Sequence, residues 1–263
     1  MSNYYYIVSG LPDISFDDSK AAMTLEQFRD EVFKSLSAAD RKVMDILLLE
    51  DECRKLIGSE RMEELIADVK AQEPCPDDVP QFMYQFVQEW VDDSWRDKAA
   101  FAEDRLWSLF YEYAMSCTNG FVKRWYEFNM DVNNIQSAIT ARKYNLDMQK
   151  VIVGSNDAAN ALRTSGARDW GLSQELDYFD DVVRLLEEED LAHRERRADM
   201  LRWNWLEENT FFNFFTVEKL FSFMVRLGMV ERWTSLDREK GQQLFRELIG
   251  TLKDQTEVPQ EFR

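Results

Sequence analysis

Apolar residues recur every three or four positions along most of this chain, which is the spacing of one face of an α-helix. Leu25, Phe28 and Val32 show this spacing near the start. Thr24 precedes them and Gln27 stands three residues after Thr24, which is the pattern of a capping box at the beginning of a helix. The pattern therefore predicts an amphipathic helix that begins at residue 25.

Two more helices are expected in the first third of the chain. Ser37 precedes a second apolar series that continues to Gly58, and serine is a preferred residue at helix N-caps. A third helix is expected from about Ser59 to Ala71. Residues 4–8, by contrast, are three tyrosines followed by isoleucine and valine, so we expect a short extended arm there.

Glycine and proline interrupt the helical pattern most densely at two places. Residues 74–80 hold three of the five prolines, and residues 154–172 hold three of the nine glycines. Neither residue type occurs in 81–118, 121–153 or 172–227, and such uninterrupted tracts favour helix. We therefore expect an all-α protein, an elongated and multi-lobed helical bundle, with lobe breaks near the two interruptions.

The middle of the chain holds the densest helical pattern. Residues 119–145 carry aromatic and apolar residues at helical spacing, and they predict two helical segments hinged near Asn129. Asn145 follows a basic turn, and asparagine tolerates the left-handed conformation of a helix C-cap. A short helix is expected from Asn156 to Thr164.

The last third predicts three further helices. Ser173 is expected to cap a long amphipathic stretch that runs through Leu191. Thr216 is expected to cap the next helix, which should end at Gly228. Asp237 is expected to open the final helix.

Two stretches of the last third have open interpretations. Residues 211–215 are four phenylalanines around Asn213, and we favour burial in a turn between lobes over an exposed interface. Acidic residues from 177 to 190 come before arginines from 194 to 202. We favour a solvated helix face aligned with the helix dipoles, and the alternative is two patches of opposite charge for different partners.

The net charge of −18 comes from 50 acidic against 32 basic residues. Because binding to phosphate backbones and anionic membranes depends on Lys and Arg, we expect neither nucleic-acid binding nor direct membrane contact. A membrane span needs roughly 18 consecutive apolar residues, and no run approaches that length. The first residues also lack a secretory signal, so a cytoplasmic protein is expected.

The chemical motifs point away from catalysis. The chain has neither of the glycine-rich phosphate-binding patterns, no G-x-S-x-G turn and no C-x-x-C pair, and its three cysteines are expected to be reduced and buried. Asp190 and His193 could share a helix face, but a single histidine cannot complete a two-helix metal site. We expect a solvated helix start there, and no catalytic residue, metal or cofactor. A metal-dependent enzyme at this segment stays open as an alternative.

Residues 131–145 resemble a segment of the C/d family of central-stalk proteins in V-type and A-type ATPases, in which the eukaryotic member is called d. The family segment has an acid, a short apolar stretch, Asn-Ile and then a basic pair. Asp131–Ile135 and Ala141–Asn145 are similar to it, with Asn145 where glycine is usual and Ala141-Arg142 where Leu-Arg is typical. The chain is also similar, over nearly its whole length, to a bacterial branch of uncharacterised proteins related to that family. The segments that carry this second likeness are residues 3–12, 121–129, 167–172 and 230–233.

The resemblance implies an all-helical, funnel-like protein of three similar lobes that catalyses nothing by itself. Such a protein binds the membrane rotor ring and the axle subunits of the central stalk, so it is cytoplasmic and peripheral to the inner membrane through its partners. It couples ATP turnover to ion transport and holds no cofactor. A free-standing helical interaction or regulatory protein related to the C/d family is the alternative.

Four residues of this segment are carried over as structural or interface positions: Asn134, Ile135, Arg142 and Lys143. For Asn134 and Arg142 we favour a structural role, in which their side chains satisfy buried backbone groups rather than contact a partner.

Overall fold

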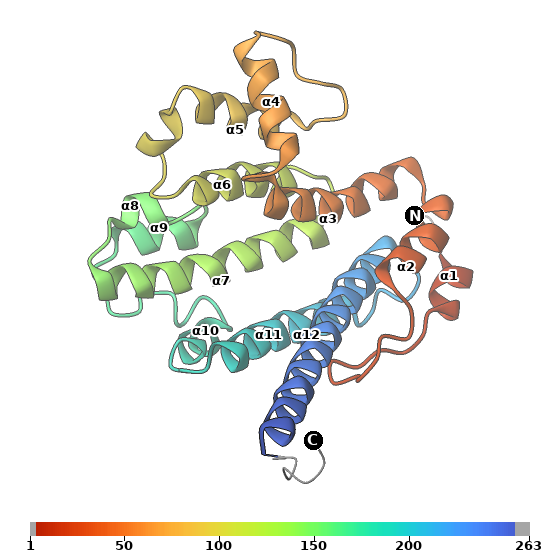
Figure 1. Cartoon of the computed structure of the whole chain (residues 1–263). Coiled ribbons are helices and arrows are strands. Elements are labelled where there is room, and N and C mark those ends of the chain that lie inside the picture. Colours follow the sequence, from red (N-terminus) through yellow and green to blue (C-terminus); the bar gives the residue numbers. More distant parts are fainter. Residues whose placement is uncertain (1–3, 256–263) are drawn as a thin grey trace, which may run out of the picture. The chain divides into compact units, whose positions relative to one another are not determined.

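The computed structural model describes the backbone of residues 4–255 and the side chains of residues 4–237. Within these residues it contains helices and no strands, so the predicted all-α class is confirmed (Figure 1). The elements in chain order are α1 (Tyr5–Gly10), α2 (Leu25–Val32), η1 (Phe33–Ser35), α3 (Ala38–Leu56), α4 (Glu60–Lys70), α5 (Gln81–Val91), η2 (Ser94–Asp97), α6 (Ala102–Met115), α7 (Gly120–Tyr144), α8 (Met148–Val151), α9 (Asp157–Thr164), α10 (Phe179–Leu185), α11 (Leu191–Thr210) and α12 (Val217–Gln255).

The chain divides into two compact units, residues 1–36 together with 213–263, and residues 37–212. The two predicted lobe breaks both lie inside the larger unit. Residues 74–80 lie between α4 and α5, and residues 154–172 hold α9 and the turns around it. The division into three similar lobes that form a funnel stays a prediction.

In the smaller unit, α2 packs against α12. The rings of Phe28 and Phe223 stack with their centroids 5.4 Å apart. Glu231 of α12 accepts a hydrogen bond of 2.9 Å from the backbone N–H of Leu25, at the first residue of α2. Both aromatic stacking and capping therefore fix the beginning of α2 on the long C-terminal helix.

In the larger unit, α7 is the central element, because it contacts α6, α8, α9, α10 and α11. Figure 1 shows α6 and α7 side by side in this unit. The aromatic pair Phe110 and Tyr126 joins these two helices, with the ring centroids 5.2 Å apart and both side chains buried. Val132 and Ile135 of α7 have no exposed surface. The core of this unit is thus built around the helix that the sequence singles out.

Most of the predicted helix starts are confirmed. The capping box of Thr24 and Gln27 is present at α2. Ser37, Ser59 and Asn156 each accept a hydrogen bond from the backbone of the helix that follows. These caps depend on residues within one turn, so the sequence is enough to predict them.

The predicted extended arm at the N-terminus is wrong, because residues 5–10 form helix α1. Tyr4 is buried, and its N–H donates to the carbonyl of Phe215, 3.0 Å away. The ring of Tyr5 lies 4.8 Å from the ring of Phe215. Contacts with a segment far along the chain therefore override the local β-propensity of the tyrosines.

The predicted hinge near Asn129 is also wrong, because α7 runs without interruption through 25 residues. The Asn129 side chain donates to the carbonyl of Trp125, one turn earlier, over 2.7 Å. Its amide group is therefore satisfied along the helix and does not interrupt the backbone ladder.

Two predicted helix boundaries in the last third are not observed. The hydroxyl of Ser173 donates to the carboxylate of Asp169 instead of capping a helix, and the predicted long stretch is divided into α10 and α11. Residues 228 and 237 lie inside α12, which continues to Gln255. A Cβ atom at Gly228 would lie 3.5 Å from the Leu25 side chain, so this glycine sits at a contact between α2 and α12. Glycine inside a helix costs about 1 kcal/mol relative to alanine, which packing of this kind can offset.

The phenylalanine-rich stretch is more exposed than predicted. Phe211 and Phe212 are 65% and 81% exposed, and Phe214 is 59% exposed. Val217 begins α12 directly after Thr216, as predicted, but the buried Thr216 hydroxyl has no hydrogen-bond partner among the described residues. The leucines of the predicted final helix lie beyond the residues whose side chains are described.

Candidate functional site

The centre of the candidate site is α7, whose two ends are fixed by asparagine. At its start, the side chain of Asn119 accepts hydrogen bonds from the N–H groups of Phe121 and Val122. At its end, Asn145 adopts the left-handed conformation, with φ 55° and ψ 43°. The predicted asparagine C-cap is confirmed, and the helix between the caps carries the segment that resembles the C/d family.

Asn134 holds the backbone of the segment after α8. Its Nδ2 donates to the carbonyl of Val153 over 2.7 Å, and its Oδ1 accepts from the N–H of Val153 over 2.8 Å. The side chain is 2% exposed, and the neighbouring Ile135 is fully buried in the core. Asn134 therefore satisfies both backbone groups of one residue, which is the type of contact expected for it.

Arg142 holds the loop that follows α9. Its Nη1 donates to the carbonyl of Arg168 over 2.7 Å, and its Nη2 donates to the carbonyl of Ala167 over 3.1 Å. The guanidinium carbon lies 3.7 Å from the centre of the Trp170 ring. A planar group with several donors can bind two carbonyls and stack on a ring at the same time, and a lysine cannot. Arg142 is thus the second backbone contact expected from the sequence.

Asp131, the acid of the same segment, is a buried carboxyl held by neutral donors. It accepts hydrogen bonds from Asn156 Nδ2 over 2.9 Å and from the Tyr178 hydroxyl over 3.0 Å. Burial raises its pKa to about 6, against the lowering effect of these two donors. This carboxyl connects α7 to the residues that precede α9 and α10.

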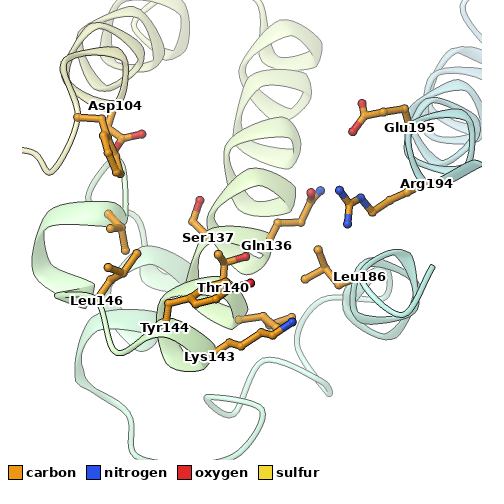
Figure 2. A pocket seen from close by; sticks show the side chains of 13 residues that line it. Asp104, Gln136, Ser137, Thr140, Lys143, Tyr144, Leu146, Leu186, Arg194 and Glu195 are labelled. Atoms are coloured by element: carbon orange, nitrogen blue, oxygen red, sulfur yellow. The ribbon is translucent and has the colours of Figure 1, made fainter. Parts of the chain in front are cut away.

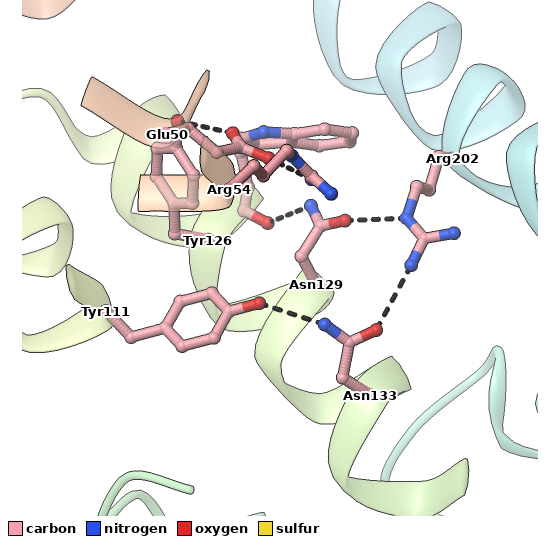
Figure 3. Close-up of polar contacts among 8 residues, drawn as sticks. Glu50, Arg54, Tyr111, Tyr126, Asn129, Asn133 and Arg202 are labelled. Atoms are coloured by element: carbon pink, nitrogen blue, oxygen red, sulfur yellow. Dashed lines mark hydrogen bonds and ion pairs between the residues drawn. The ribbon is translucent and has the colours of Figure 1, made fainter. Parts of the chain in front are cut away.

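A second polar cluster joins α7 to α6 and α11 (Figure 3). Arg202 of α11 donates from Nε to Asn129 Oδ1 over 2.8 Å, and from Nη2 to Asn133 Oδ1 over 3.2 Å. Asn133 Nδ2 donates in turn to the Tyr111 hydroxyl of α6 over 3.0 Å. Burial lowers the pKa of Arg202, and the nearby guanidinium of Arg54 acts in the same direction.

The same cluster reaches α3 through Glu50. Its carboxylate accepts from Arg54 over 2.6 Å and from the Tyr126 hydroxyl over 3.1 Å. Figure 3 shows these groups next to Asn129 and Arg202. Each asparagine and tyrosine in the cluster therefore has a partner, and the cluster contributes to the packing of four helices.

On another side of α7, the structure has a groove of about 500 Å³, which Figure 2 shows from close by. Its polar lining from α7 includes Gln136, Ser137, Thr140 and Lys143. Arg194 and Glu195 of α11 and Asp104 of α6 complete the charged part of the lining. The volume lies in the range that binds small molecules, about 300–1,000 Å³.

The groove contains polar groups that have no partner within the described residues. The side chains of Gln136, Ser137 and Thr140 make no hydrogen bond there, and Lys143 and Arg194 make no ion pair. Burial raises the pKa of Asp104 to about 6. These groups are available to a bound molecule, whereas those around Asn134, Arg142 and Arg202 are occupied by the protein itself.

The acidic segment near the only histidine forms a helix start. Asp190 is the N-cap of α11, and its carboxylate accepts from the N–H of His193 over 2.8 Å. The His193 side chain is exposed. Among the described residues, no three His, Cys, Asp or Glu side chains are grouped so that they could hold a metal ion. The search for a membrane-spanning helix, over the described part of the chain, also finds none.

The three cysteines are free, as expected, but only Cys53 is buried, and Cys75 and Cys117 are half-buried. Burial raises the pKa of the Cys53 thiol to about 12, so it stays protonated near neutral pH. The prediction that all three lie in the core is therefore right for one of them.

Of the groove residues, the sequence pointed to Lys143 alone. Asp104, Gln136, Thr140 and Arg194, among others, were not expected to line a common site. One signal was present, because Gln136, Thr140 and Lys143 follow one another at four and three residues, and so share a helix face. A solvated face has the same spacing, so the pattern alone does not indicate a groove.

The fold and the site define an all-helical protein in which a central helix holds its neighbours on some sides and lines a groove on another. The chain belongs to the family described as "Protein of unknown function (DUF2764)", whose model matches residues 1–256. No curated protein and no solved structure matches the chain.

Proposed function

We propose that this chain is a non-catalytic central-stalk adaptor of a V/A-type rotary ATPase, which couples the axle to the membrane rotor ring. The observation that carries the proposal is the resemblance of residues 131–145 to the segment of the C/d family. In this chain the segment lies on the central helix of an all-helical unit. An all-helical architecture is what the resemblance implies.

The contacts of α7 support a mechanical role. A part that transmits torque must resist deformation, and buried polar contacts with full partners hold helices in one arrangement. Asn134, Arg142 and Arg202 each make two hydrogen bonds to groups outside their own helix. The uninterrupted helix of 25 residues is about 37 Å long, at 1.5 Å per residue. These features favour a rigid connecting part.

The charge of the chain supports partners of a particular kind. With a net charge of −18, it is attracted to basic protein surfaces and repelled by acidic ones. We propose cytoplasmic contact with the axle and the ring, peripheral to the inner membrane through these partners. The coupling of ATP turnover to ion transport is then a property of the assembled enzyme, to which this chain contributes no catalytic group.

Affinity purification from native membranes tests the proposal. The chain carries a tag at its chromosomal locus, the membranes are solubilised in mild detergent, and the recovered proteins are quantified by mass spectrometry. Recovery of ring and axle proteins in amounts comparable to the chain is expected, with an untagged strain as the control. Absence of both kinds of protein from the recovered material would contradict the proposal.

The groove favours the second candidate, a free-standing helical interaction or regulatory protein related to the C/d family. A groove with unpartnered polar groups among the described residues is the type of site at which such a protein binds its ligand. Deletion of the gene separates the two candidates. A motor that assembles and stays fully coupled without this chain would favour the free-standing protein.

A metal-dependent enzyme is tested directly by the metal content of the purified protein. A stoichiometric metal that disappears on His193→Ala would support that third hypothesis, and its retention in the variant would not.

A further inference from the structure

The groove along α7 has a basic end and an acidic end. Lys143 from the last turn of α7 and Arg194 from the first turn of α11 supply the basic end, where they outnumber Glu195. Figure 2 shows Lys143 and Arg194 on the same side of α7 as Leu186, and Asp104 on the opposite side. A molecule in the groove therefore meets opposite charges at its two ends.

The acidic end is electrostatically separate from the basic end. Burial raises the pKa of Asp104 to about 6, the backbone of Phe101 lowers it, and Glu103 raises it further. No lysine or arginine of the described residues is among the groups that influence this carboxyl. Within the same groove, then, Asp104 lacks a cation, and Lys143 and Arg194 lack an anion, as far as the described side chains go.

Apolar surface lies between the charged ends. Phe101, Tyr144 and Leu146 line the groove although they are 59%, 63% and 45% exposed. Large apolar side chains that remain this exposed around one groove indicate a binding surface. Such a surface suits the hydrocarbon part of a ligand.

Hydrogen-bonding groups line the floor of the groove. The hydroxyls of Ser137 and Thr140 make no hydrogen bond within the described part of the protein, whereas Thr210 and Thr164 elsewhere donate to the carbonyl one turn earlier. The hydroxyls of the groove are therefore available to a bound polar group.

We propose that this groove binds a small zwitterion in which an apolar chain separates an ammonium from a carboxylate, with the ammonium at Asp104 and the carboxylate between Lys143 and Arg194. The site is independent of the central-stalk role, because all of its residues lie in one compact unit. It gives the chain a ligand-binding activity in addition to its proposed contacts with other proteins.

Calorimetric titration of the full chain with three probes tests the charge requirement. The probes are ε-aminocaproate, which has both charges, caproate, which has only the anion, and hexylamine, which has only the cation. The zwitterion is expected to bind about tenfold more tightly than either singly charged probe, because each end adds an ion pair. The shorter γ-aminobutyrate and the longer ω-aminocaprylate then measure the distance between the two ends.

Variants assign the two ends. Lys143→Met and Arg194→Met keep the apolar stems and are expected to weaken ε-aminocaproate and caproate by about tenfold, while hexylamine binding stays unchanged. Asp104→Asn is expected to weaken ε-aminocaproate and hexylamine and to leave caproate unchanged. Circular dichroism and thermal unfolding check that each variant is folded.

The chain offers a matched control for each change. Lys123 of α7, Arg197 of α11 and Asp180 of α10 are exposed and lie outside the groove. Lys123→Met, Arg197→Met and Asp180→Asn are expected to leave all three affinities as they are.

Two results would overturn the proposal. One is the absence of saturable binding of ε-aminocaproate by the folded chain. The other is equal affinity for all three probes, which would leave only apolar contact. If Asp104→Asn fails to fold, the comparison of caproate with ε-aminocaproate in the Lys143 and Arg194 variants still decides the outcome.

Discussion

Two sides of the same helix use polar residues in different ways. The pinning side of α7 consists of Asn129, Asn133, Asn134 and Arg142, each of which is hydrogen-bonded to another part of the protein. The groove side consists of Gln136, Ser137, Thr140 and Lys143, which line an open volume. Amides and basic side chains occur on both sides. The role of each residue therefore depends on whether a neighbouring segment offers a partner, and not on its residue type.

The contrast teaches where substitutions should matter for stability. A polar side chain that is hydrogen-bonded inside the protein leaves its partners unsatisfied when it is removed, and each such group costs about 1–3 kcal/mol. A side chain that bonds only to water leaves nothing unsatisfied. The following predictions compare the two sides, in order of decreasing expected effect.

Asn134→Leu is expected to give the largest loss, about 3 kcal/mol in the free energy of unfolding. The substitution keeps a side chain of similar size but removes both hydrogen bonds to Val153. Denaturant titration followed by circular dichroism measures the loss. Gln136→Leu, two residues away on the groove side, is the matched control and should change the stability by less than about 0.5 kcal/mol. Equal losses in the two variants would contradict the comparison.

Asp131 should make stability depend on pH. Because burial raises its folded-state pKa to about 6, above that of an unfolded aspartate, the protonated form favours the folded state. This stability is fully present below about pH 4 and is lost as the pH rises through 6, which amounts to about 3 kcal/mol for two pH units.

Unfolding measured at several pH values in Asp131→Asn isolates this effect from other carboxyls. Asparagine has no charge to lose, so the difference between wild type and variant should change by that amount between pH 4 and pH 7. A difference that stays constant with pH would show that Asp131 keeps an ordinary pKa in the folded protein.

Arg142→Lys should have an intermediate effect, about 1–2 kcal/mol. Lysine keeps the charge but cannot donate to two carbonyls while it stacks on Trp170. The shift of the denaturant midpoint measures the loss. Arg168→Lys is the control in the same loop, since only the backbone carbonyl of Arg168 takes part in the contact. A midpoint no lower than that of the control would remove Arg142 from the pinning side.

The sequence predicts most of the features that depend on neighbours within one turn. The caps at Thr24, Ser37 and Asn145 are examples, because each side chain or backbone conformation acts on the adjacent helix end. The all-α class follows from the same local signals summed over the chain. The backbone contacts of Asn134 and Arg142 were also expected in kind, although their partners could not be named.

The features that failed depend on distant parts of the chain. Helix α1 forms where Tyr4 and Tyr5 contact Phe215, and α12 continues through Gly228 where Leu25 packs on it. The groove likewise brings Lys143 close to residues about fifty positions further along the chain, in α11. Helical periodicity shows which residues share a face, but it does not show what that face meets.

The smallest effect is expected on the groove side, for Ser137→Ala combined with Thr140→Val. Neither hydroxyl is hydrogen-bonded within the described residues, so their removal leaves no group unsatisfied, and the free energy of unfolding should change by less than about 0.5 kcal/mol. The same denaturant titration measures it, with Asn134→Leu as the positive control. A loss above about 1.5 kcal/mol would mean that these hydroxyls have partners inside the protein, and the distinction between the two sides of α7 would then fail.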